Sequence, residues 1–374
     1  MARWRYILLD ALARVVPNRS ESGLGIAVLT PGHLGDVLHA VPMLKALRKG
    51  KPAARIVWLV GPWSETLARR YAGDVDEIRV FGPSLPSFTR GRREWKQGAC
   101  RQWRMAIDLR RQGVDVLIGS MDGVGRFLAN VLCPGLWVGI GDRRPPRVRS
   151  EIETAVQPYE KDRYEADALC GLLQALEIEA HADRLDYGVL PEERQEAEAF
   201  LRAEGVDAGR PVAMIAPGSG WSGKNWLPER FGAVAEGLAK DYGFQIVWVG
   251  GPGEESLVPA ARPEDFNWVG RTSLPLLAAL MENASMFIGN DGGLLHLAAA
   301  LDVPTVSLWG PTSPGKWAPR GARHRHVRRM ERCEGCIYWD YREACRHDRI
   351  CMRSISVENV RKAVQSLREK REGK

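Results

Sequence analysis

Hydrophobic residues along this chain form short apolar runs, separated by segments in which apolar positions recur every three or four residues. A short run bounded by turn residues is typical of a buried strand, and the wider spacing is typical of a helix. In the first half the expected strands are Gly25–Thr30, Arg55–Val60, Ile78–Phe81, Val114–Gly119 and Leu136–Ile140. In the second half they are Val212–Ala216, Gln245–Gly250, Asn267–Val269, Met286–Gly289 and Thr305–Trp309.

The helical spacing is clearest after the first strand, where Val37, Val41, Leu44 and Leu47 share one face. Pro42 either kinks this helix or marks its first turn. Further helices are expected at Tyr159–Ile178, Pro191–Glu204, Phe231–Lys240, Leu274–Met281, Leu294–Leu301 and Ser356–Arg371. Strands that alternate with helices predict parallel sheets covered on both faces.

The chain has 374 residues, enough for two domains with separate cores. We expect an amphipathic extension over 1–20, a first Rossmann-like domain over 21–185, a second over 186–352, and a terminal helix over 353–374. The predicted fold class is α/β, with the two domains facing a central cleft outside the carboxyl ends of their strands. Three loops rich in turn residues follow expected strands, at 31–36, 217–225 and 290–293.

The loop at 290–293 contains Asp291, Gly292 and Gly293 and opens an apolar helix. Glycines at the start of a helix leave its first N–H groups open to an anion such as a phosphate. Asp291 would repel that anion, so it is suited to bind a hydroxyl, or it caps the helix. His296, in the same helix, is either a neutral core histidine or a hydrogen-bonding partner of a ligand.

The loop at 217–225 contains Ser219, Gly220 and Lys224. Its glycines allow the backbone N–H groups to approach a phosphate, and the lysine adds positive charge for a diphosphate. The order of residues is not that of a Walker loop, because Asn225 follows the lysine. The alternative is a solvated loop lysine.

Carboxylates follow two other strands. Asp36 lies at the start of the first helix, where it is placed to accept a proton or to cap the helix. Glu254 and Glu255 follow the strand at 245–250, where an acidic residue can bind ribose hydroxyls or start a helix.

The formal net charge is +7, and the basic residues cluster. Such clusters attract polyanions, and the absence of a standard nucleic-acid-binding motif favours a phosphorylated glycan or an anionic membrane surface over nucleic acid. A basic amphipathic segment over 1–17 is consistent with membrane contact or with packing on the protein itself. We assign acceptor binding to these arginines: Arg90, Arg92, Arg93, Arg143 and Arg144.

Four of the seven cysteines lie close together, at Cys333, Cys336, Cys345 and Cys351. Four thiolates can hold zinc or an iron–sulfur cluster, although the second pair lacks knuckle spacing. A structural site of this kind, or a cluster without metal, is expected, with no role in the chemistry.

Three segments together carry a family resemblance: Gly-Asp-x-Leu-x-x-x-Pro around Asp36, the Gly-Ser loop that leads to Lys224 and Trp226, and the Asp-Gly-Gly-x-x-His motif at Asp291. They resemble the heptosyltransferases, glycosyltransferase family nine. Relatives more often carry Ser or Thr at the position of Gly292, and Leu227 is inserted before Pro228.

The resemblance implies an inverting glycosyltransferase of the GT-B architecture that needs no cofactor. Asp36 would be the base, the loops at 219–224 and 292–293 would bind the donor diphosphate, and Asp291 would bind the sugar. The implied donor is ADP-heptose and the implied acceptor a phosphorylated glycolipid such as lipopolysaccharide core. The implied location is cytoplasmic, at the inner membrane face. The alternatives are a related nucleotide-sugar transferase, a sugar-nucleotide epimerase and a non-catalytic nucleotide-sugar-binding protein.

Overall fold

The chain folds into two compact units, Met1–Asp183 (unit 1) and Arg184–Lys374 (unit 2), divided two residues before the expected boundary. The computed structural model describes residues 23–81, 92–121, 123–141, 148–259, 262–329, 345 and 347–372. The expected N-terminal extension lies outside this part of the chain.

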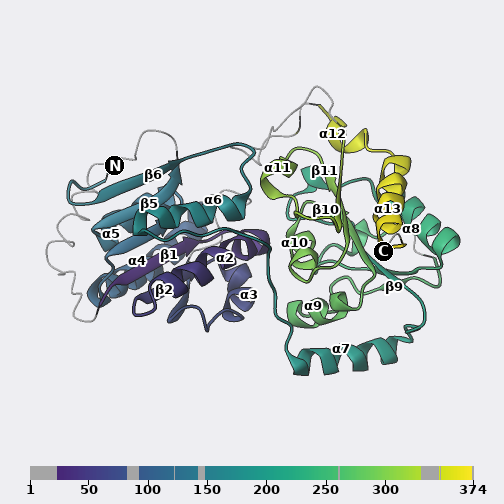
Figure 1. Cartoon of the computed structure of the whole chain (residues 1–374), viewed down its shortest axis with the longest axis horizontal. Helices are drawn as coiled ribbons and strands as arrows, with labels where there is room; N and C mark the ends of the chain where they lie inside the picture. The colour runs from purple at the N-terminus through teal and green to yellow at the C-terminus, as the bar shows by residue number, and fades with distance from the viewer. Residues whose placement is uncertain are drawn as a thin grey trace. The chain divides into compact units, whose positions relative to one another are not determined.

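Unit 1 contains a parallel sheet in the order β3-β2-β1-β4-β5-β6 (Figure 1). Its strands are β1 (Gly25–Thr30), β2 (Arg55–Val60), β3 (Glu77–Val80), β4 (Val116–Gly119), β5 (Leu136–Gly141) and β6 (Glu153–Pro158). Its helices are α2 (Leu34–Gly50), η1 (Pro62–Ser64), α3 (Glu65–Arg69), α4 (Arg92–Gln112), α5 (Gly123–Leu132), α6 (Glu165–Gly171) and η2 (Leu172–Leu176). Helix α2 packs on α6 and α4 packs on α5, and every residue of β1 is buried because both faces of the sheet are covered.

Unit 2 contains a second parallel sheet in the order β12-β11-β10-β7-β8-β9. Its strands are β7 (Val212–Ala216), β8 (Gln245–Trp248), β9 (Phe266–Asn267), β10 (Met286–Asn290), β11 (Thr305–Trp309) and β12 (His324–Arg328). Its helices are α7 (Pro191–Glu204), η3 (Ser222–Lys224), α8 (Pro228–Tyr242), η4 (Glu255–Leu257), α9 (Leu274–Glu282), α10 (Gly293–Ala300), α11 (Pro314–Trp317), α12 (Ile350–Arg353) and α13 (Val357–Glu372). Helix α7 packs on α9, and α8 packs on α13 over a core that includes Phe231 and Val360.

Both sheets have the doubly wound order in which the first strand lies beside the fourth. In unit 1 this pair is β1 and β4, and in unit 2 it is β7 and β10. Helices leave the two strands of such a pair in opposite directions, so the loops at their carboxyl ends leave a crevice between them. The loops at 31–36, 217–225 and 290–293 all lie at these switch points, which confirms the α/β fold class.

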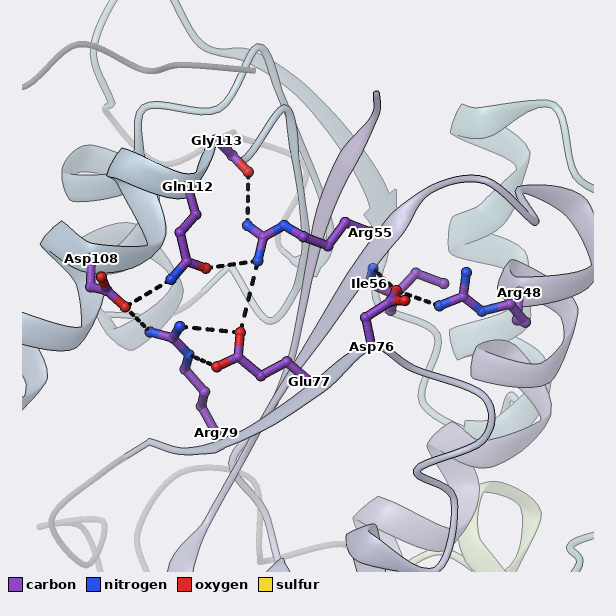
Figure 2. Close-up of polar contacts among 9 residues, drawn as sticks. All are labelled: Arg48, Arg55, Ile56, Asp76, Glu77, Arg79, Asp108, Gln112 and Gly113. Carbon is purple, nitrogen blue, oxygen red and sulfur yellow. Dashed lines mark hydrogen bonds and ion pairs between the residues drawn. The ribbon is translucent and has the colours of Figure 1, made fainter. Parts of the chain in front are cut away.

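The opposite, amino-terminal edge of the unit 1 sheet is closed by paired charges (Figure 2). Arg79 contacts Glu77 at 2.6 Å and Asp108 at 2.6 Å, and Arg55 donates to Gln112 at 2.8 Å. These contacts join the starts of β2 and β3 to the end of α4. Arginines at this edge are therefore used in holding the sheet to its helix.

The sequence did not predict β6 and β12. Both are edge strands that pair with one neighbour only, and neither has a continuous apolar run. The expected helix at Tyr159–Ile178 was too long, because residues to Pro158 are in β6 and α6 begins at Glu165. Pro42 lies inside α2 and not in its first turn.

Candidate functional site

Two loops of unit 2 lie side by side at the switch point, because β7 and β10 are neighbours. The first runs from Pro217 to Trp226 and the second from Asp291 to Gly292. The buried side chain of Asn290 joins both ends of the first loop: it donates to the Pro217 carbonyl at 2.7 Å and accepts from the Trp226 N–H at 3.0 Å. We call the Pro217–Trp226 segment the donor loop.

Gly292 is the N-cap of α10, in an extended conformation (φ −166°). A β-carbon placed on Gly292 would lie 3.5 Å from that of Ser219, so the donor loop passes beside the first turn of this helix. The Ser219 hydroxyl donates to Asn225 Oδ1 at 2.6 Å, and nothing lies within 4 Å of a β-carbon built on Gly220. Open N–H groups at Gly293 and an accessible glycine backbone form a cradle for an anion.

Asp291 lies beside this cradle at the centre of a polar cluster and is 4% exposed. Its Oδ2 accepts from Lys224 Nζ at 3.0 Å and from the Thr312 hydroxyl at 2.7 Å. His296 Nε2 lies 3.6 Å from Oδ1, which is long for a hydrogen bond. Burial alone would raise the pKa of Asp291, but the charge of Lys224, aided by His296 and Thr312, outweighs burial and holds this pKa well below its ordinary value. Asp291 is therefore an anion at neutral pH.

The geometry excludes the capping alternative for Asp291 and the solvated-loop alternative for Lys224. Gly292 caps α10 without any side-chain bond, so Asp291 does not act as the helix cap. Lys224 is not a solvated loop lysine, because its side chain is 16% exposed and pairs with Asp291. His296 is buried and faces the same carboxylate.

Glu254 reaches the donor loop, whereas within the described part of the chain Glu255 makes no hydrogen bond to that loop. A β-carbon on Gly218 would lie 2.2 Å from the Glu254 carboxylate, which also accepts from the Gly251 N–H at 2.8 Å. Glu255 accepts from the Gly253 N–H at 3.1 Å, and backbone hydrogen bonds from its own N–H and from Gly253 lower its pKa. Of the two candidates, Glu254 is the one at the site.

In unit 1, Asp36 lies in the first turn of α2 and its Oδ2 accepts from the His33 N–H at 2.7 Å. The N-cap of α2 is His33, so Asp36 is not an N-cap aspartate; it closes a capping box from the third position of the helix. The carbonyl of Gly32, in the same loop, accepts from Trp63 Nε1 at 2.7 Å and from the Ser64 hydroxyl at 3.0 Å. The loop at 31–36 is thus fixed from β1, α2 and η1, with the Asp36 carboxylate half-buried at the carboxyl edge.

Several expected site residues lie outside the described part of the chain. Five of them lie entirely outside it: Arg90, Arg143, Arg144, Cys333 and Cys336. At Arg92 and Arg93 only the helical backbone of α4 is described.

The two cysteines of the cluster that are described are both free thiols. Cys351 is 4% exposed in the core of unit 2, and Cys345 Sγ accepts from the Arg349 N–H at 3.3 Å. Within the described ranges no group of three metal-ligating side chains occurs. No helix of these ranges is both long and apolar enough to cross a bilayer.

The sequence missed four residues that shape the two sites. Asn290 is the last residue of β10. Thr312 lies in the turn after β11, and the Gly-Pro-Thr motif of that turn is the only sequence signal for its role. Trp63 and Ser64 come from the turn after β2, which has no motif. Their roles depend on which strands are neighbours, and the sequence does not state strand order.

Two doubly wound units, with an anion cradle and a buried acid at the switch point of the second, are the architecture of the GT-B class of transferases. The sequence profile described as glycosyltransferase family 9 (heptosyltransferase) matches residues 166–345. Lipopolysaccharide heptosyltransferase 1 of Pseudomonas aeruginosa is 25% identical over 324 residues, which cover 83% of this chain and 86% of the relative.

Solved structures agree on the fold. A family 9 glycosyltransferase from Veillonella parvula has a TM-score of 0.71 and 22% identity, covering 92% of this chain and 97% of its own. The ADP-heptose lipopolysaccharide heptosyltransferase II of Escherichia coli has a TM-score of 0.68 and 18% identity, and the match covers 94% of this chain and 100% of that structure's chain. Residues 166–345 match the model of glycosyltransferase family 9, and relatives that align over most of the chain are heptosyltransferases, so the chain is a transferase, as the resemblance in the sequence implied. These findings favour a transferase over the epimerase and the non-catalytic binding protein.

Proposed function

We propose that this chain transfers heptose from ADP-heptose to a hydroxyl of lipopolysaccharide core or a related glycan. The names of its relatives support the donor and the acceptor. The observation that carries the proposal is the Lys224–Asp291–Thr312 cluster beside the first turn of α10. It offers positive charge and open N–H groups for a diphosphate, next to a carboxylate that can bind sugar hydroxyls.

The donor binds to unit 2 in this proposal. Ser219, Gly220 and Lys224 of the donor loop, with Gly292 and Gly293 of α10, hold the diphosphate. Asp291 accepts hydrogen bonds from sugar hydroxyls, and the His296 ring lies next to its carboxylate. Glu254 accepts from ribose hydroxyls, because its carboxylate lies against the donor loop.

Asp36 of unit 1 is the base. It takes the proton of the acceptor hydroxyl as that oxygen attacks the anomeric carbon, and the bond from that carbon to the diphosphate oxygen breaks. The electron pair of the broken bond leaves with ADP, whose growing charge is met by Lys224 and the N-terminus of α10. Attack from the face opposite the leaving group inverts the anomeric configuration. Because these protein groups supply the countercharge, the reaction requires no metal or other cofactor.

The acceptor binds to unit 1, where basic residues gather. Arg101 and Arg104 are exposed on α4, the helix that also contains Arg92 and Arg93. We assign this basic region to the phosphates of the acceptor and to anionic lipid at the cytoplasmic face of the membrane, with no role for nucleic acid.

The proposal is tested by incubating the protein with ADP-heptose, with and without a heptose-deficient lipopolysaccharide core. We expect release of ADP and an acceptor heavier by one heptose, only when both substrates are present. Turnover of the donor without acceptor would identify an epimerase instead. Absence of both ADP release and ADP binding would reject the proposal.

A further inference from the structure

The donor loop is closed by one side chain that touches both of its ends. Asn290 is the last residue of β10 and is 2% exposed. Its amide nitrogen donates to the Pro217 carbonyl at the start of the loop, and its amide oxygen accepts from the Trp226 N–H at the end. The eight residues between Pro217 and Trp226 are thus bridged by one planar amide, which has a donor and an acceptor in fixed positions.

The residues between these two ends are those that would bind the diphosphate. Ser219 and Lys224 both lie inside the bridged segment. The other bonds of the loop include a local one from Ser219 to Asn225 and two to the last part of the chain: Arg349 donates to the Ser222 carbonyl at 3.2 Å, and Trp226 Nε1 donates to the Ile355 carbonyl at 3.0 Å. Asn290 is also joined by a peptide bond to Asp291, which pairs with Lys224 at 3.0 Å. A shift of the loop would therefore move Lys224 relative to both Asp291 and the first turn of α10.

We propose that Asn290 is a positioning residue for donor binding: by tying both ends of the Pro217–Trp226 loop to β10, it sets the place of Ser219 and Lys224 against the N-terminus of α10. This inference rests on the proposed function of the donor site. Asn290 touches neither the diphosphate nor the reacting atoms in this account. Its effect is largest on the diphosphate part of the donor, because Ser219 and Lys224 lie inside the bridged segment.

The chain offers a matched control at the other edge of the same sheet. Gln245, the first residue of β8, is 6% exposed and uses its amide in the same way. It accepts from the Asp207 N–H at 2.8 Å and donates to the Asp207 carbonyl at 2.8 Å. Asn290→Ala and Gln245→Ala each remove a buried amide that holds a turn, but only the first turn belongs to the donor site.

The experiment measures binding of ADP and of adenosine by calorimetry to the full chain and to the variants Asn290→Ala, Gln245→Ala and Lys224→Met. We expect both alanine variants to lower the unfolding temperature. Of the two alanine variants, only Asn290→Ala should weaken ADP binding, by about tenfold or more, because a displaced loop loses its fit to the ligand. Adenosine, which lacks the diphosphate, should lose less affinity for Asn290→Ala than ADP does.

Other outcomes separate this inference from the proposed function. If Lys224→Met weakens ADP binding while Asn290→Ala binds ADP as well as Gln245→Ala does, the inference is wrong and the donor site stands. An equal loss for ADP and adenosine in Asn290→Ala would show a general structural role and would also overturn it. If the unmodified chain binds no ADP, the proposed function fails first. Should Asn290→Ala not fold, Asn290→Ser is measured in its place, with Gln245→Ser as control.

Discussion

The ion pair between Lys224 and Asp291 makes a quantitative prediction for Lys224→Met. Methionine keeps the length of the apolar stem but removes the ammonium group that lies 3.0 Å from Asp291 Oδ2. The side chain of Asp291 is 6% exposed, so its carboxylate would remain buried with Thr312 as hydrogen-bond donor and without its cation. Removing one partner of a buried pair costs about 3–5 kcal/mol.

We expect the lower end of this range, because Lys224 is itself 16% exposed and water can reach the vacated position. A loss of about 3 kcal/mol corresponds to a fall of roughly 6–12 °C in the unfolding temperature of a domain of this size. Asp291→Asn should cost less, about 1 kcal/mol, because Lys224 can turn toward solvent and Thr312 can still donate to the amide oxygen. The double variant should be less destabilised than the sum of the two, because the unpaired buried charge is gone.

Scanning calorimetry of the four proteins at neutral pH gives the coupling between the two residues. The difference between Lys224→Met and the unmodified chain should also shrink as the pH falls. The low pKa of Asp291 means that the pair stabilises above the unfolded pKa of an aspartate and is lost as the pH falls through the folded pKa. Strictly additive losses in the double variant would refute the reasoning.

The remaining predictions concern glycines, a buried histidine and metal. Gly292→Ser should keep transfer and raise stability by a few tenths of a kcal/mol, because the nearest atom to its β-carbon, in Ser219, is 3.5 Å away and serine is a good N-cap. Transfer and thermal unfolding check this, and a large loss of either would contradict it. Gly218→Ala should weaken ADP binding in calorimetry, because the new methyl group displaces the Glu254 carboxylate, which lies 2.2 Å from its position; unchanged affinity would argue against Glu254. Burial lowers the pKa of His324 to about 4, so the unfolded state binds more protons than the folded state between pH 6.5 and 4. The free energy of unfolding should therefore fall by about 2 kcal/mol from pH 7 to pH 5. Urea unfolding at the two pH values measures this, and His324→Gln should remove that part of the pH dependence. Transfer should persist in EDTA, since Lys224 and α10 supply the countercharge; loss of transfer that added metal restores would oppose the cofactor-free proposal.

Much of the fold could be predicted from the sequence because its strands are buried on both faces. Strands such as β1, β2, β7 and β11 are continuous apolar runs, and their bounds agree with the expected ones. The edge strand β12 reads His-Arg-His-Val-Arg and has no continuous apolar run. In the structure its histidines bond to hydroxyl groups of β11, with His324 Nδ1 lying 2.9 Å from Thr305 Oγ1. Pairing with a neighbour strand, and not hydrophobicity, defines this element.

At the candidate site, too, local motifs could be predicted from the sequence and contacts between distant loops could not. The donor loop and the Asp291 motif were recognisable because glycine, serine and lysine follow strand ends in a local pattern. The pairing of Lys224 with Asp291 was not predicted, since the two residues are 67 positions apart and were given separate ligands. Asn290 and Thr312 were missed for a related reason: each acts on another loop, across strands that only the sheet order brings together.

The role of Asp36 is the central claim, and one substitution separates catalysis from structure. Asp36→Asn keeps an oxygen that can accept from the His33 N–H, so the capping box and the fold should persist. Asp115→Asn is the matched control, because Asp115 accepts from the Gly25 N–H at 2.7 Å at the opposite edge of the same sheet.

The decisive measurement is the rate of heptose transfer by these two variants, with ADP binding measured alongside. The account predicts that Asp36→Asn binds ADP as the unmodified chain does and transfers roughly 10²–10⁴-fold more slowly, while Asp115→Asn transfers at the normal rate. A folded Asp36→Asn variant that binds ADP and transfers heptose at the normal rate would contradict it.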